Sequence, residues 1–436
     1  MSISSSLNAS VAGLSANATR LATISDNIAN SSTYGYKRAE ADFHSMVIDS
    51  GNGGYTAGGV GVSTTRMIDQ AGPRISTSNA TDISVNDRGF IPVTTQTALG
   101  KSNGDLPLQL ATTGSFRTDE NGVLKTTSGL VLLGWPAASD GTIPNYPRDT
   151  GDALVPVQIN LNQSAVEPTT EMTLCVNLPA TETEAGASGD PLSLSVEYYD
   201  NLGASQTITA TYTPTVPAGA TDPATNTWTL TLTDSASSGA VIGEYTLVFD
   251  DSRTAGGTLA SVTLISGGAY DPASGVISAS VAGGPLDITI GAVGDSSGMT
   301  QLSGGFSPIP VSKNGSPVGN LTSVEIDANG YVSANFDNGI SRVIFQIPLV
   351  DVPNPNGLIS LDNQSYQISR ESGGFFLWNA GDGPTGDIVS YSLEESSTDV
   401  ADELTSLIQT QRAYSSNAKV IQTVDEMLQE TANIKR

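Results

Sequence analysis

Residues 398–436 decide how this fold is read: TDVADELTSLIQTQRAYSSNAKVIQTVDEMLQETANIKR. No Gly or Pro interrupts the stretch, acidic residues stand in its first turn and Lys435 and Arg436 end it, which is the charge order that a helix dipole favours. A helix of this length is typical of a coiled-coil seam rather than of an ordinary globular helix, so it needs a partner. Its apolar or small residues recur about every 3.5 positions, at Val400, Leu404, Leu407, Tyr414, Ala418, Ile421 and Leu428.

The N-terminal residues predict that partner. A second helix is expected to end near Asn30, where Asn30-Ser31-Ser32-Thr33 breaks the pattern, and the small residues around its apolar stripe would let another helix approach closely. The periodicity leaves two interpretations open: a helical hairpin that closes one globular domain, or two helices that pack between subunits of a polymer. The stripe consists of Ile3, Leu7, Leu14, Leu21, Ile24 and Ile28.

Composition excludes several classes of function. The chain has 436 residues, enough for roughly two to four domains, and a formal net charge of −26. That charge argues against nucleic acid and against anionic membrane surfaces as partners. Cys175 is the only cysteine and His44 the only histidine, which removes intrachain disulfides, Ser-His-Asp triads and most zinc sites. We therefore expect no catalytic residue, no cofactor-binding residue and no metal ligand.

Membrane and secretory signals are also missing from the sequence pattern. No stretch approaches the roughly 20 apolar residues of a membrane span. The first basic residue is Arg20, so the N-terminus does not resemble a secretory signal peptide. We expect a cytoplasmic protein or one that is exported by a route that reads another kind of signal.

Two β-rich blocks that lie far apart in the sequence share the same turn chemistry. Asp119-Glu120-Asn121-Gly122 and Asp327-Ala328-Asn329-Gly330 both predict hairpins, because Asn-Gly tolerates positive φ. We expect the two blocks to form one inner β domain.

The segment between these blocks is acidic and strand-rich. Trp228, Leu230 and Leu232 alternate with polar residues, as in an all-β sandwich or barrel. Residues 149–312 carry 17 acids and a single base, Arg253. We interpret these acidic residues as a solvated surface that resists self-association. A calcium site is the alternative, although no Asp-x-Asp-x-Asp-Gly ladder is present.

The predicted fold is therefore multidomain, with coiled-coil-like α-helical termini and nested, mainly β domains. The two ends of the chain form the helical part, the segments next to them form the inner β domain, and the middle segment forms the outer β domain. The expected parts are terminal helices at 1–34 and 398–436, irregular or extended connections at 35–71 and 376–397, an inner β domain at 72–149 and 313–375, and an acidic outer β domain at 150–312.

Motifs at both ends of the chain resemble the bacterial flagellar rod and hook proteins. The first β block, Gly114 to Trp135, is similar to that family as well, whereas the acidic insert carries no pattern that we can assign to it. Two departures are visible: Tyr36 stands where Phe is usual, and Ser396-Ser397-Thr398-Asp399 replaces Ser-Asn-Val-Asp, which leaves the cap of the last helix undefined. The signature residues are Asn27, Ile28, Ala29, Asn30, Thr33, Tyr34, Gly35, Tyr36 and Lys37, and Gln411, Arg412, Tyr414 and Asn417.

Within that family, a chain of this length with a large insert resembles the hook members. The resemblance implies a homopolymer that forms a curved, flexible tube, the universal joint that connects rod to filament and transmits motor torque. It also implies an extracellular location in the flagellum, export through the flagellar type III apparatus without a cleaved signal peptide, and contacts with the hook cap, the distal rod protein and the hook–filament junction protein. The apolar stripes of both terminal helices are then the expected subunit interface.

Two other functions remain as alternatives. A distal rod protein with an unusual insert belongs to the same class, and a secreted β-rich adhesin would suit the Gly/Thr-rich strands and the acidity. Neither a P-loop nor a dinucleotide fingerprint is present, so an enzyme is not expected.

Because the chain has one Cys and one His, neither EDTA nor a reductant should shift the melting temperature by more than a degree or so. Differential scanning calorimetry with and without each reagent tests this. A fall of many degrees with EDTA would reveal a carboxylate metal site, most simply in the acidic insert.

Overall fold

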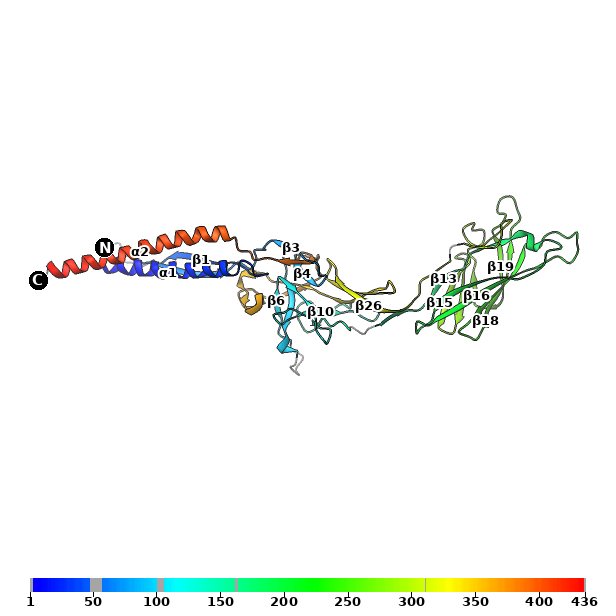
Figure 1. Ribbon diagram of the computed structural model, residues 1–436, viewed down its shortest axis with the longest axis horizontal. Helices are drawn as coiled ribbons and strands as arrows, with labels where there is room; N and C mark the ends of the chain where they lie inside the picture. The colour runs from blue at the N-terminus through cyan, green and yellow to red at the C-terminus, as the bar shows by residue number, and fades with distance from the viewer. Residues whose placement is uncertain (1–2, 48–56, 100–105, 161–163, 310, 435–436) are drawn as a thin grey trace. The chain divides into compact units, whose positions relative to one another are not determined.

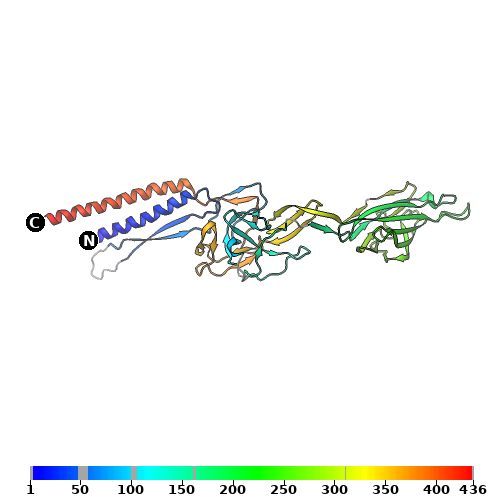
Figure 2. The same ribbon diagram turned by 60° about the horizontal axis from the view of Figure 1, so that its bottom comes forward.

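The computed structural model describes residues 3–47, 57–99, 106–160, 164–309 and 311–434. The chain divides into two compact units (Figures 1 and 2). Unit 1 comprises residues 1–161, 323–334 and 341–436, and unit 2 comprises residues 162–322 and 335–340. The division falls inside β26 (Ser316–Ile326) and β27 (Tyr331–Phe336).

Two helices form one end of unit 1. Helix α1 (Ile3–Ala29) and helix α2 (Val400–Ile434) lie side by side and run in opposite directions (Figures 1 and 2). Asp399 caps α2, because its Oδ1 accepts hydrogen bonds from the backbone N–H groups of Ala401 at 2.8 Å and Asp402 at 3.3 Å. In the described part of the chain, neither helix is both long and apolar enough to cross a membrane.

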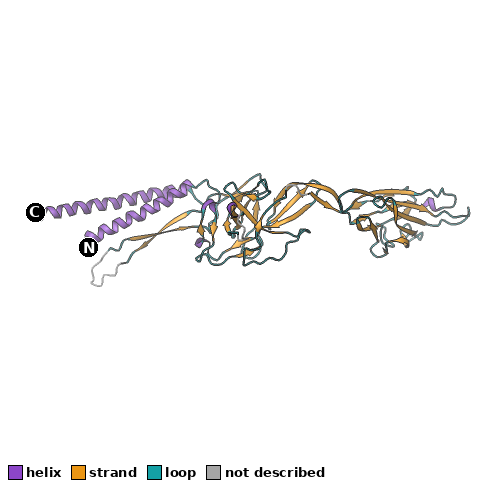
Figure 3. Ribbon diagram, turned by 90° about the horizontal axis from the view of Figure 1, so that it is seen from below, coloured by secondary structure: helices purple, strands orange, loops and turns teal. Residues whose placement is uncertain are grey.

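The irregular or extended connection predicted at 35–71 contains a paired β-hairpin, which the sequence analysis did not predict. β1 (Ala39–Ser45) and β2 (Val60–Arg66) pair in antiparallel register from Ala39↔Arg66 to Ser45↔Val60, and both contact α1 (Figure 3). Residues 51–61 are rich in Gly and were expected to be irregular, but Gly61 faces His44 across this ladder and leaves room for the imidazole ring. Residues 48–56 of the Gly-rich segment lie outside the described part.

The inner part of unit 1 joins the two distant blocks in one sheet. β10 (Leu130–Pro136) pairs with β5 (Ile91–Thr95) through residues 130–132 and with β28 (Ser341–Gln346) through residues 135 and 136. The predicted hairpin at Asp119 to Gly122 is confirmed by the pairing of β8 with β9. The remaining strands of unit 1 are β3 (Arg74–Ser76), β4 (Asp82–Val85), β6 (Gln109–Ala111), β7 (Thr113–Ser115), β8 (Arg117–Thr118), β9 (Leu124–Lys125), β11 (Val155–Pro156), β29 (Leu349–Asp351), β30 (Ile359–Ser360), β31 (Tyr366–Gln367), β32 (Phe376–Trp378), β33 (Ile388–Ser390) and β34 (Ser392–Glu394).

The irregular or extended connection predicted at 376–397 contains paired strands as well. β32, β33 and β34 pair with β29, β4 and β3, so this segment belongs to the inner β structure. The core of this region includes Phe90, Leu133, Trp135 and Leu377, which all lie in unit 1. Unit 1 therefore has an apolar core of its own.

Unit 2 is built from strands around a second apolar core. In its five-stranded sheet β15–β16–β17–β18–β19, the inward Trp228, Leu230 and Leu232 are fully buried, as their alternation predicts. Its strands are β12 (Ser164–Glu167), β13 (Glu171–Thr173), β14 (Val176–Pro179), β15 (Leu192–Tyr199), β16 (Ser205–Pro214), β17 (Thr227–Asp234), β18 (Ala240–Phe249), β19 (Leu259–Gly267), β20 (Tyr270–Asp271), β21 (Val276–Val281), β22 (Gly284–Thr289), β23 (Thr300–Leu302), β24 (Ser307–Pro308) and β25 (Ser312–Lys313).

The bounds of this unit differ from the predicted 150–312. β11 pairs with β10 through Leu133↔Pro156, which keeps the chain in unit 1 up to residue 161. At the other end, Ser316 to Asn320 pairs with β12, so unit 2 extends to residue 322. Strand pairing, rather than the onset of acidic composition, sets the boundary.

The insert should be removable because its ends already meet. Glu167 and Ser316 lie directly opposite each other in an antiparallel pair, so an Asn-Gly link between them would close a two-residue hairpin. Deletion of 168–315 removes the apolar cluster that runs from Met172 to Met299 in unit 2 and none of the apolar cluster of unit 1. We expect the shortened chain to unfold cooperatively with a melting temperature close to that of the corresponding transition in the full chain. A shortened chain that lacks a cooperative melting transition would show that unit 1 depends on the insert.

Candidate functional site at the helix junction

The N-terminal signature forms the turn that carries the chain from α1 into the β structure. The Gly35 backbone N–H donates to the Glu394 carbonyl at 2.8 Å, and the Ser397 N–H donates to the Tyr36 carbonyl at 3.0 Å. Gly35 has a φ of 70°, and a Cβ there would lie 3.0 Å from Thr113 Cγ2. Both the conformation and the close approach favour Gly at this position.

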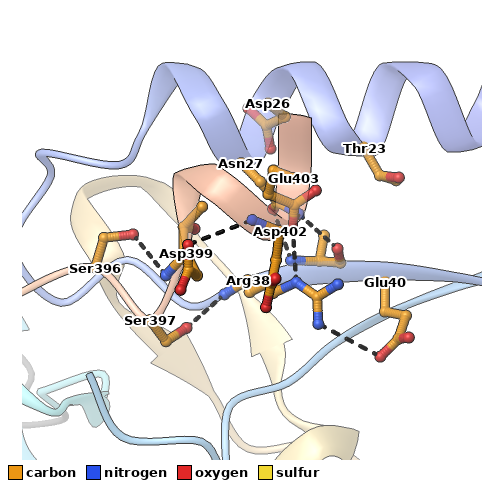
Figure 4. A network of polar contacts seen from close by, with 12 residues as sticks. Thr23, Asp26, Asn27, Arg38, Glu40, Ser396, Ser397, Asp399, Asp402 and Glu403 are labelled. Atoms are coloured by element: carbon orange, nitrogen blue, oxygen red, sulfur yellow. Dashed lines mark hydrogen bonds and ion pairs between the residues drawn. The ribbon is translucent and has the colours of Figure 1, made fainter. Parts of the chain in front are cut away.

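A polar hub joins α1, α2 and β1 (Figure 4). The Asn27 side-chain amide donates to Glu403 Oε1 at 2.9 Å and to the Ala39 carbonyl at 2.8 Å, while its Oδ1 accepts from the Ala39 N–H at 2.9 Å. Arg38 Nε donates to the same Glu403 oxygen at 2.6 Å. Glu403 is only 1% exposed, so its charge depends on these two partners. The hub fixes the base of both helices to the first strand.

A second ion pair lies next to this hub in the sequence. Lys37 Nζ is 2.6 Å from Glu394 Oε1, and both side chains are nearly fully buried at 3% and 4% exposure. The ammonium also donates to the Gln70 carbonyl at 2.8 Å, and the Gly72 N–H donates to Glu394 Oε1 at 2.7 Å. One buried cation thereby connects the signature turn to β34 and to the segment that precedes β3.

Tyr36 adds a polar contact that a Phe at this position could not make. Its hydroxyl lies 2.9 Å from Asp26 Oδ2 and 3.1 Å from Asn27 Oδ1, and the Arg66 guanidinium lies 4.9 Å from the ring centre. Burial, reinforced by the hydrogen bond to Asp26, raises the pKa of Tyr36 to about 12. The hydroxyl thus remains a neutral donor at physiological pH.

The faces through which α1 and α2 meet are mainly polar or small. Gly13 faces Asn417 so closely that a Cβ on Gly13 would lie 2.9 Å from Asn417 Nδ2. On α2 the buried positions Glu403, Thr410 and Val424 and the half-buried Asn417 follow a seven-residue spacing. On α1 the buried residues are Ser5, Ser10, Gly13, Ala16, Asn17, Ile24 and Asn27.

The predicted apolar stripes are only partly covered by this contact. Of the α1 stripe, Ile24 is buried and Leu7, Leu14, Leu21 and Ile28 are half-buried, while the Ile3 side chain lies outside the described part. Of the α2 stripe, Leu407, Ala418 and Ile421 are half-buried, and Val400, Leu404, Tyr414 and Leu428 are exposed. Leu404 and Tyr414 keep 46% and 44% of their surface in solvent.

The remaining signature residues divide between the turn and the helix surface. Asn30 donates from Nδ2 to the Asp26 carbonyl at 2.9 Å, and Thr33 donates to Asn30 Oδ1 at 3.3 Å. Ala29, Tyr34, Gln411 and Arg412 are exposed. Arg38, Glu394 and Glu403, which carry the hub and the second ion pair, were not predicted, because single-sequence patterns give no signal for a pair separated by more than 350 residues.

The charged side chains of this site connect structural elements to one another. In the described part of the chain, no three His, Cys, Asp or Glu side chains converge as a metal site requires. The acids and bases are instead used in pairs that tie two helices to a β structure. The arrangement can therefore hold the helices in a fixed orientation on that structure.

Lys37→Met should destabilise unit 1 by about 3–5 kcal/mol, because it leaves the Glu394 carboxylate buried without its cation. Urea unfolding of unit 1 at neutral pH measures the effect. Arg412→Met is the matched control and should stay within about 0.5 kcal/mol, because Arg412 is exposed and unpaired among the described residues. Equal, small effects of both changes would show that the buried pair is not a structural tie.

Comparison with known proteins places these ends in one family. Residues 7–37 match the family model described as "Flagella basal body rod protein", and residues 389–434 match "Flagellar basal body rod FlgEFG protein C-terminal". Residues 160–316 match "Flagellar basal body protein FlaE D2 domain", so the expectation that the insert carries no family pattern is wrong.

Whole-chain relatives agree with these models. The flagellar hook protein FlgE of Brucella suis biovar 1 is 33% identical, and that of Rhizobium meliloti is 32% identical, each over 100% of both chains. The flagellar hook protein FlgE of Salmonella typhimurium is 29% identical over 99% of this chain and 100% of that protein. The chain therefore belongs to the flagellar hook protein family.

Proposed function

We propose that this chain is the structural subunit of a bacterial flagellar hook. It polymerises into a curved, flexible tube that connects the rod to the filament and transmits motor torque. The observation that carries the proposal is the apolar stripe of α2, which α1 leaves half exposed although the two helices lie side by side.

The stripe has the size and composition of a subunit contact. Val400, Leu404 and Tyr414 are each about two-fifths exposed, and no charged residue interrupts the stripe between Val400 and Ala418. Full burial of a Leu or Val side chain stabilises by about 1.5–3 kcal/mol relative to full exposure. Covering several half-exposed side chains in each subunit supplies a driving force that is repeated along a polymer.

The junction and the acidic unit support the mechanical part of the proposal. The hub around Glu403 and the Lys37–Glu394 pair couple the helices to the inner β structure, so a force on the helices is passed to the β structure. Unit 2 carries 16 acids against two bases, Arg253 and Lys313. Like charge on neighbouring outer units favours separation, which lets them move past each other when the tube bends.

Location and partners are part of the same proposal. The subunit is exported through the flagellar type III apparatus and is extracellular once assembled. It assembles under the hook cap, between the distal rod protein and the hook–filament junction protein. A distal rod protein is the second candidate, and the full-length hook relatives weigh against it, as they do against an adhesin.

A charged substitution within the α2 stripe tests whether the stripe is a subunit contact. Leu404→Asp should abolish tube formation, because an unpaired carboxylate would be buried at the contact. The melting curve of the monomer should stay unchanged, since Leu404 is exposed in the single chain. Gln409→Asp adds the same charge to an exposed position of α2 outside the stripe and should leave assembly intact.

Negative-stain electron microscopy of purified or secreted protein measures assembly, and calorimetry measures monomer stability. Normal tubes from Leu404→Asp would contradict the interface. A wild-type chain that forms no tube under any assembly condition would contradict the function itself.

A further inference from the structure

A cavity of about 330 Å³ lies beside the buried Lys37–Glu394 pair, and every residue that lines it belongs to unit 1. Its walls bring together the loop after β2, the end of β4 and the turn that follows β4. Ligand sites in proteins occupy roughly 300–1,000 Å³, so the cavity is large enough for one large side chain or a small molecule.

Part of the cavity lining is apolar. Ile68, Val85 and Phe90 contribute to it, and all three side chains are buried, so they present a fixed surface. Pro355, which is half-buried, adds to this part of the lining. An occupant with a flat apolar group would be stabilised there, because the contact removes apolar surface from water.

The Lys37–Glu394 pair adds a hydrogen-bond acceptor and a donor to the same cavity. Glu394 Oε1 accepts from both Lys37 Nζ and the Gly72 N–H, so Glu394 Oε2 is left without a hydrogen bond among the described residues. The Lys37 ammonium has three N–H donors and directs two of them at described partners, Glu394 Oε1 and the Gln70 carbonyl. An occupant that bonds to both remaining groups is favoured, because buried polar groups without partners are costly.

A phenol matches both parts of this lining. Its hydroxyl can donate to Glu394 Oε2 and accept from Lys37 Nζ, while its ring covers the apolar part. A carboxylate only accepts and an ammonium only donates, and each is repelled by one member of the ion pair. An amide has both functions but little apolar surface, and an aliphatic group leaves both polar atoms without a partner.

The exposed residues of the lining set the charge around the phenol. Asp69 and Asp87 line the cavity, are exposed and form no ion pair with any described residue. The charge of Arg88, which also lines the cavity, is balanced by Asp351 at 2.6 Å. The two unpaired carboxylates favour an occupant with a basic group beside the phenol.

We propose that this cavity binds a tyrosine side chain that a partner protein presents next to a basic residue. A second copy of this chain does not offer that combination in exposed form. Of its 13 tyrosines, only Tyr36 stands next to a basic residue in the sequence, and Tyr36 is buried. The proposal does not require assembly into a tube, so it can fail or hold independently of the proposed function.

Short peptides titrated into the full-length chain test the proposal, with saturation-transfer NMR as the measurement. The probe is acetyl-Gly-Tyr-Lys-Gly-amide, and we expect saturable binding with a Kd of about 1 mM or below. The same peptide with Phe in place of Tyr should bind about tenfold more weakly or worse, because it leaves Glu394 Oε2 and Lys37 Nζ without partners. The peptide with Glu in place of Lys should bind about threefold more weakly or worse, because it faces like charge.

Variants of the chain assign the binding to the cavity. Ala71 is exposed and lines the cavity, so Ala71→Trp should fill it and abolish binding of the probe. Ala138→Trp, at an exposed position outside the cavity, should bind the probe as the wild type does. The melting curves of both variants should match that of the wild type.

The two carboxylates can be tested apart from the phenol. Asp69→Asn combined with Asp87→Asn should remove the preference for Lys over Glu and keep the preference for Tyr over Phe. Asn suits position 87, where φ is 73°, because Asn adopts the left-handed region more readily than most residues.

Equal binding of the Tyr and Phe peptides, or unchanged binding of the probe to Ala71→Trp, would overturn the inference. No saturable binding of the probe up to about 10 mM would overturn it as well. A chain that binds none of the peptides but loses tube formation with Ala71→Trp would show that a second copy occupies the cavity, which also contradicts the inference.

Discussion

The structure of the helical end depends on one buried carboxylate. Glu403, in the first turn of α2, accepts hydrogen bonds from Asn27 in the last turn of α1 and from Arg38, which directly precedes β1. A buried carboxylate is tolerated only where such partners are in place. The rotation of α2 about its own axis is therefore set by charge satisfaction at its base rather than by apolar packing along its length.

That constraint explains why the surface through which α2 contacts α1, the polar seam, is formed mainly by polar and small residues. Glu403 brings Thr410 and Asn417 to the same side of α2, seven and fourteen residues further on, and this side faces α1. The apolar stripe is turned aside and stays half exposed. Under the proposed function, the exposed stripe is the apolar surface that remains for binding another copy, while the polar side of the same helix binds α1.

Sequence patterns were enough to predict the two helices and the two Asn-Gly hairpins, but not which faces of the helices are used. The lack of Gly and Pro and the charge order of residues 398–436 predict α2, and the Asn-Gly turns at 121 and 329 predict hairpins that the structure contains. Periodicity also predicts α1 as the partner of α2. It could not show which side of each helix is used, because the deciding contacts join Asn27 and Arg38 to Glu403, more than 350 residues away.

The other predictions that differ from the structure failed because strand pairing depends on residues that are distant in the sequence. The segment around Gly61 was expected to be irregular because it is rich in Gly, yet in the structure Gly61 is a ladder position opposite His44. The onset of acidic residues suggested a domain boundary near 150, but β11 pairs with β10 and keeps the chain in unit 1 for another 11 residues. Composition changes along the chain, whereas domains end where strand pairing ends.

A helical reconstruction of the assembled tube at side-chain resolution is the most direct measurement. We expect Glu403 to bond Asn27 and Arg38 of its own copy, and Leu404 and Tyr414 to be buried against a different copy. A tube in which these two side chains remain in solvent, or in which Glu403 takes its partners from a neighbouring copy, would contradict the division between an internal polar seam and an external apolar stripe.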